Sequence, residues 1–156
     1  MGCVLRISGD KFNVEKFIQN SKLKPNLIFH KNQPINKLKP KGKKYKSSGL
    51  SISTSNADFD NFDIQIKDTI KFLKKNFKNL ADIKKDKTIT EFVLDFGITS
   101  RISKGNTFTQ SDTFPAELLK LSGNLDIDIC LSQISDSKKF KKLFKDFFKD
   151  KKINII

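Results

Sequence analysis

Four carboxylates are spaced in a way that permits chemistry. Glu91 and Asp95 belong to one segment of alternating polarity, and Asp126 and Asp128 belong to another. Side chains two or four residues apart on a strand share one face, so adjacent strands would gather all four. Such a group could bind Mg²⁺ or act in acid–base catalysis. The plainer interpretation, which we favour, is a solvated sheet face on which these carboxylates pair with lysines.

A nucleophile assisted by a histidine is the second chemistry to weigh. His30 is the only histidine, and Cys3 and Cys130 are the only cysteines. Both cysteines stand in apolar, strand-like runs, where cysteine behaves as a small hydrophobic side chain. No cysteine close to His30 in the sequence completes a metal-binding set. We therefore predict no catalytic residue, no metal ligand and no cofactor, and hence no enzyme.

A lysine-rich segment carries the strongest signal for binding. No Asp or Glu occurs between Glu15 and Asp58. Pro34 and Gly42 interrupt regular structure there, so we predict an exposed, weakly structured loop over residues 33–48. The lysines of this loop are Lys37, Lys39, Lys41, Lys43, Lys44 and Lys46.

These six lysines could serve three purposes. They could meet an acidic protein partner, since complementary charge speeds association. They could contact the phosphates of a nucleic acid, although Tyr45 is the only aromatic ring among them and surfaces that stack bases use several. They could also form an ordinary solvated loop. As partner-binding residues they point first to an acidic protein and second to a nucleic acid.

The whole chain is basic and has the size of a single domain. Its 156 residues carry 31 Lys+Arg against 17 Asp+Glu, a formal net charge of +14. Only Arg6 and Arg101 are arginines, so the surplus is lysine, which the composition of an AT-rich genome could also produce. Either origin gives a field that attracts anionic partners. We predict one domain over residues 1–156, with its core over residues 1–134.

Cysteine usage and hydropathy indicate the compartment. Two cysteines provide no disulfide framework, which fits a reducing environment. Arg6 interrupts the first apolar run, so we expect no signal peptide. No stretch approaches the ~20 apolar residues of a membrane span. The sequence therefore predicts a cytoplasmic domain without a transmembrane segment.

Hydrophobic periodicity alternates along the chain between period two and helical spacing. Strands are predicted over residues 3–8, 27–29, 49–54, 89–98 and 125–131. Helices are predicted after the cap Asn13, over residues 62–83, and from Pro115 to a left-handed Gly123. This order predicts an α+β fold with a single mainly antiparallel sheet and helices packed on one face. It has a ferredoxin-like β-α-β-β-α-β core plus α-β and a C-terminal helix.

That C-terminal helix is predicted over residues 136–152 and is basic and amphipathic. Its apolar positions recur at helical spacing: Phe140, Leu143, Phe144, Phe147 and Phe148. This apolar face could pack on the core, enter a groove of a partner, or lie on an anionic membrane surface. We favour packing on the domain and expect no role at a membrane.

The order and spacing of these elements resemble an uncharacterised bacterial family, the DUF4279 domains. The similar segments are residues 6–10, 14–18, 49–53, 92–98 and 115–129. The resemblance covers roughly residues 2–134 and leaves out the basic tail. It implies the fold described above and carries over no catalytic residue. Small bacterial domains of this sort include immunity proteins, which block a toxin.

One hypothesis for function and two alternatives follow. The leading hypothesis is a non-enzymatic protein-binding domain, in its narrowest form an immunity-like inhibitor of a bacterial toxin. The first alternative is nucleic-acid binding through the lysine-rich surface. The second is a metal-dependent enzyme built on Glu91, Asp95, Asp126 and Asp128.

Overall fold

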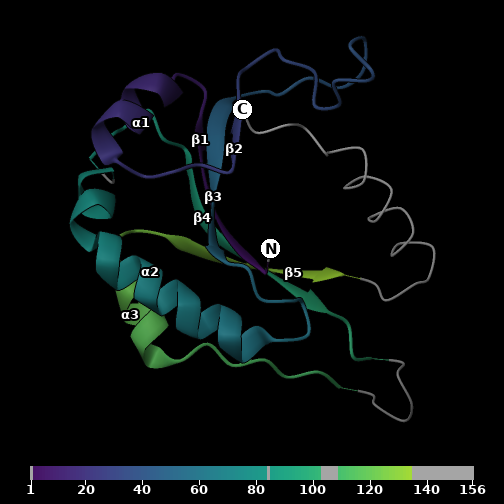
Figure 1. The fold of residues 1–156 in the computed structure, drawn as a ribbon, viewed down its shortest axis with the longest axis vertical. Coiled ribbons are helices and arrows are strands. Elements are labelled where there is room, and N and C mark those ends of the chain that lie inside the picture. The colour runs from purple at the N-terminus through teal and green to yellow at the C-terminus, as the bar shows by residue number, and fades with distance from the viewer. Residues whose placement is uncertain (1, 84, 103–108, 135–156) are drawn as a thin grey trace.

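The computed structural model describes residues 2–83, 85–102 and 109–134 (Figure 1). This part of the chain contains five strands and three helices in the order β-α-β-β-α-β-α-β. Their bounds are β1 (Cys3–Gly9), α1 (Val14–Ser21), β2 (Leu27–Phe29), β3 (Ser48–Ser55), α2 (Phe62–Ile83), β4 (Glu91–Thr99), α3 (Ala116–Asn124) and β5 (Asp128–Ile134). The helix predicted over residues 136–152 lies outside the described residues.

The strands form one five-stranded sheet in the order β2-β3-β1-β4-β5. β1 pairs antiparallel with β3 on one side and with β4 on the other, and β2 pairs antiparallel with β3. These four strands have the strand order of a ferredoxin-like unit. β5 joins parallel to β4 after the crossover helix α3, as a parallel pair requires. The predicted fold class is therefore confirmed, with one parallel pair in a mainly antiparallel sheet.

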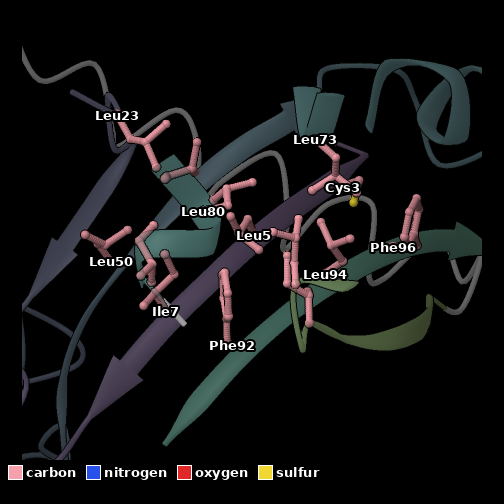
Figure 2. Packing of buried hydrophobic residues seen from close by; sticks show 14 of the residues in the cluster. Cys3, Leu5, Ile7, Leu23, Leu50, Leu73, Leu80, Phe92, Leu94 and Phe96 are labelled. Atoms are coloured by element: carbon pink, nitrogen blue, oxygen red, sulfur yellow. The ribbon is translucent and has the colours of Figure 1, made fainter. Parts of the chain in front are cut away.

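Within the described ranges, the three helices lie on one side of the sheet and no helix lies on the other (Figure 1). We call this opposite side the open face. β1 alternates between the two sides: Cys3, Leu5 and Ile7 are fully buried on the helix side, and Arg6 is on the open face. Figure 2 shows Leu5 and Ile7 pointing into the hydrophobic cluster.

The long helix α2 supplies most of the opposing apolar surface. Its observed bounds match the predicted residues 62–83. Leu73 and Leu80 are fully buried against the sheet, and each such side chain contributes about 1.5–3 kcal/mol when removed from water. The buried Gln65 donates its side-chain amide to the backbone oxygens of Asp58, at 3.0 Å, and Gly97, at 2.8 Å. The start of α2 is thereby joined to β4.

The connection from α3 to β5 differs from the prediction. Gly123 lies inside α3, and the left-handed residue is Asp126, with φ 53. Leu125 turns its side chain into the core, fully buried, while its amide bonds to the oxygen of Ser122 at 3.1 Å. Because the helix closes at Leu125, the left-handed residue that turns the chain is Asp126 and not Gly123. Asp tolerates the left-handed conformation better than most residues. β5 consequently begins at Asp128, later than predicted, and Asp126 is not on the strand.

Burial should make the Cys3 thiol unreactive. Removal from water raises the pKa of Cys3 from 9.0 to about 11. In a Cys130→Ser variant we expect a thiol reagent at neutral pH to label the chain only as fast as it unfolds. Because the folded pKa is raised, this group's contribution to stability is complete below pH 9.0 and declines as pH rises toward about 11. Rapid labelling of the native variant would contradict the burial of β1.

Candidate functional site

The segment between β2 and β3, residues 30–47, forms a hairpin, which we call the basic hairpin. The Asn32 amide donates to the Tyr45 oxygen, and the Tyr45 amide donates to the Gln33 oxygen, both at 2.9 Å. The Ile35 amide donates to the Lys43 oxygen at 2.9 Å. The prediction of an exposed segment is confirmed. The predicted loop has no helix or strand over residues 33–47, only turns and the single bridge between Pro34 and Lys44, but these cross-chain bonds satisfy part of its backbone.

Local hydrogen bonds also order the tip of the basic hairpin. The side-chain oxygen of Asn36 accepts the Leu38 amide at 2.9 Å, and its backbone oxygen accepts the Lys39 amide at 2.9 Å. The Gly42 amide then bonds to the Lys39 oxygen at 2.8 Å. Asparagine often forms turns in this way, by imitating a backbone acceptor. The tip is therefore closed by its own hydrogen bonds.

An aromatic stack fixes the basic hairpin to the sheet. Phe29 and Tyr45 lie parallel, with ring centroids 4.4 Å apart and an interplanar angle of 21°. Phe29 is also the strand partner of Gly49 on β3. A Cβ on Gly49 would stand 2.5 Å from Cζ of Phe29, so only glycine leaves room for the ring. Gly49 thus allows Phe29 to lie against the sheet and to receive Tyr45.

All six lysines predicted to bind a partner lie on this hairpin, and all six are exposed. Among the described residues none of them forms an ion pair. Other lysines nearby do: Lys31, at the start of the hairpin, is 2.6 Å from a carboxylate oxygen of Asp10. The structure therefore collects six cationic groups on an ordered support and leaves their charge available to an anionic partner.

The strand carboxylates are used differently from the predicted metal set. Arg6 stands opposite Val93, so Glu91 and Asp95 flank it diagonally. Its Nε lies 3.2 Å from Glu91 Oε1, and its Nη1 lies 2.8 Å from Asp95 Oδ2. Ser8 donates to Glu91 at 2.7 Å and Ser132 to Asp95 at 2.6 Å. Protein donors on the open face therefore already occupy these two carboxylates.

The other two carboxylates do not complete this group. Asp128 begins β5 opposite Val93, whereas Asp126 precedes the strand in the left-handed turn. Over the described ranges, no cluster of three or more His, Cys, Asp or Glu side chains could hold a metal ion. The prediction that Asp126 and Asp128 share one strand face is wrong, because the strand starts only at Asp128.

The histidine and the two cysteines are far apart in the fold. His30 follows β2 at one edge of the sheet, and its Nε2 is 3.4 Å from Glu15. Cys130 is on β5 at the opposite edge, four strand spacings or roughly 19 Å away. Cys3 is fully buried on the helix side of β1. This separation gives no support to a Cys–His nucleophile.

A cleft of about 480 Å³ lies between α1 and the C-terminal part of α2. Lys11 and Lys16 line one side, and Asp82 and Asp86 line the other. Both carboxylates have partners within the chain: Asp82 is 2.7 Å from Lys85, and Asp86 accepts the amide and hydroxyl of Thr88. The cleft therefore has polar walls whose acidic groups are already engaged.

Comparison with protein-family models identifies the class. Residues 1–136 match the family described as Domain of unknown function (DUF4279), so the chain belongs to that family. The resemblance inferred from the sequence is thereby confirmed. Searches of curated proteins and of solved structures found no match. Within the described ranges no helix has the length and apolar character needed to cross a membrane.

Removing the aromatic stack should loosen the basic hairpin. Tyr45 is the only tyrosine and the chain has no tryptophan, so tyrosine fluorescence reports this stack alone. In Phe29→Ala we expect altered tyrosine emission and faster amide exchange at residues 32–45, with the rest of the sheet unchanged. Phe72→Ala on α2 is the control for the loss of a ring. Unchanged emission and exchange in Phe29→Ala would show that the stack does not anchor the hairpin.

Mg²⁺ should not stabilise the native chain, because Arg6 and two serines already contact Glu91 and Asp95. We expect the melting temperature to stay constant as Mg²⁺ is raised at fixed ionic strength. A ligand at 100 times its Kd would add about 2.7 kcal/mol of stability, which a thermal melt detects easily. A rise with Mg²⁺ that disappears in Asp95→Asn would instead support the metal-dependent enzyme.

Proposed function

We propose that this chain is a non-enzymatic domain that binds an acidic protein partner through the basic hairpin. One observation carries the proposal: Lys37, Lys39, Lys41, Lys43, Lys44 and Lys46 are exposed on an ordered hairpin with no ion-pair partner among the described residues. Such a field steers an oppositely charged protein and raises its association rate. Order in the hairpin reduces the entropy lost on binding.

Three features favour a protein over a nucleic acid. The Tyr45 ring is stacked on Phe29, which occupies one of the two ring faces a base could use. Both arginines are engaged within the chain, Arg6 as described and Arg101 with Asp112 at 2.7 Å. Ile35 and Leu38, on the hairpin, are 52% and 81% exposed, and apolar side chains of this kind anchor protein interfaces. Nucleic-acid binding through lysine–phosphate contacts is the second candidate.

In its narrowest form the proposal makes the chain an immunity-like inhibitor of a bacterial toxin, acting in the reducing environment of the cytoplasm. A small domain can block a toxin simply by covering its functional surface. Co-expression with the partner tests this form. Rescue of growth by the native chain, but not by a variant that cannot bind, would support this form. If the partner alone does not slow growth, it is no toxin and this form is excluded.

Charge reversal on the basic hairpin tests the general proposal. Partners are captured from the native lysate at low and high salt with nuclease present, and the association rate with the recovered protein is then measured. In Lys41→Glu/Lys43→Glu/Lys44→Glu we expect that rate to fall at least about tenfold at low salt. The control reverses three lysines away from the hairpin: Lys67, Lys71 and Lys78 on α2.

Two results would count against the proposal. Equal association rates for the hairpin variant and the α2 control would show that the hairpin does not steer the partner. Recovery of nucleic acid alone, lost as salt rises, would favour the second candidate.

A further inference from the structure

β2 forms one edge of the sheet and pairs only with β3 among the described strands. An edge strand presents backbone N–H and C=O groups that can pair with another extended chain. Sheet edges are commonly protected by lysine, proline or a bulge within the strand. β2 has no lysine, proline or bulge, since its three residues are Leu27, Ile28 and Phe29, and its short length is the one protective feature it has. Among the described residues, no other strand covers its outer edge.

Exposed apolar side chains are concentrated in the same part of the chain. Large hydrophobic residues with substantial exposure are Leu27, Ile28, Ile35, Leu38, Ile64, Ile102, Leu119 and Leu131. Half of this set falls within residues 27–38, on β2 and the first half of the basic hairpin. Leu27 and Ile28 are 43% and 44% exposed, which is unusual for neighbours on a strand that alternates its faces. Both faces of β2 therefore offer apolar contact beside the open edge.

The positive charge around β2 determines which kind of polypeptide segment can pair with its edge. Residues 16–57 contain no acidic side chain. The acidic groups that reach this region are Glu15, beside His30, and Asp10, beside Lys31, so the local charge is still mainly positive. A second copy of this chain would bring together two molecules of net charge +14 and two basic hairpins. The opposite edge, β5, begins with Asp128 and has no lysine. The β2 edge thus fits an acidic segment and disfavours self-association.

We propose that the acidic partner adds an extended segment as a new strand along the outer edge of β2. Backbone groups of the segment pair with those of β2, and its apolar side chains cover Leu27 and Ile28. Its carboxylates meet the lysines of the basic hairpin. This inference rests on the proposed function and specifies how the partner binds. Strand addition of this type takes its affinity from backbone pairing and its specificity from side-chain contacts.

Two synthetic peptides test strand addition without the natural partner. The first alternates Glu and Val over eight residues, and the second is the same peptide with every amide nitrogen methylated. Both have the same charge and side chains, but only the first can donate backbone hydrogen bonds. We expect the first to bind the native chain at least about tenfold more tightly at low salt. Amide exchange of residues 27–29 should slow only when the first peptide is bound.

Matched variants separate the edge from the charge. Leu27→Ser/Ile28→Ser should weaken binding of the unmethylated peptide, because its valines lose the apolar side chains that they cover, whereas Leu131→Ser on the β5 edge should leave that binding intact. The charge-reversed hairpin should weaken binding of both peptides alike. Circular dichroism checks that each variant is folded, and the amide-exchange result on the native chain stands even if the β2 variant unfolds.

Four outcomes would overturn the inference. If both peptides bind equally and only the charge-reversed hairpin weakens binding, strand addition is excluded and the proposed function stands. If neither peptide binds and charge reversal has no effect, the proposed function falls with it. A salt-resistant dimer of the native chain that Leu27→Ser/Ile28→Ser dissociates would assign the edge to a second copy. Binding to vesicles with 30% phosphatidylserine but to neither peptide would assign the basic surface to a membrane.

Discussion

The central position of β1 constrains every other part of this molecule. β1 pairs with β3 on one side and β4 on the other, and Cys3, Leu5 and Ile7 are fully buried beneath the helices. Because the strand has period two, burying these three side chains places Arg6 on the open face. The pairing with β4 then puts Arg6 between two carboxylates. The pairing with β3 positions Gly49, against which Phe29 and the basic hairpin are held.

This arrangement divides the polar residues into two groups. Those that could do chemistry are satisfied within the fold: Glu91 and Asp95 by Arg6 and serines, and Asp112 by Arg101. The lysines of the basic hairpin have no such partners among the described residues. A domain that exposes its cationic groups on a hydrogen-bonded hairpin is suited to recognising an acidic surface. The DUF4279 family fixes the class of the domain, and this distribution of charge is the basis of the proposed function.

Much of the fold could be predicted from the sequence, because long periodic segments carry their own structural signal. The stripe on residues 62–83 gave the bounds of α2, and the alternation around Phe92–Ile98 placed β4. The hairpin could not be predicted in this way. Its order comes from bonds between residues such as Asn32 and Tyr45, and from a stack between Phe29 and Tyr45, which no local pattern reveals. The sequence was enough to place Glu91 and Asp95 on one face. Neither their pairing with Arg6 nor the late start of β5 could be predicted, because both depend on strand register.

The central claim is that residues 27–46, and not the open face or the α1–α2 cleft, form the binding surface. Hydrogen exchange of the full chain, with and without the captured partner, tests it most directly. The account predicts slower exchange confined to β2 and the basic hairpin, with Arg6, Asp95 and the cleft residue Asn79 unaffected. Protection centred on the open face or the cleft, with residues 27–46 unchanged, would contradict it.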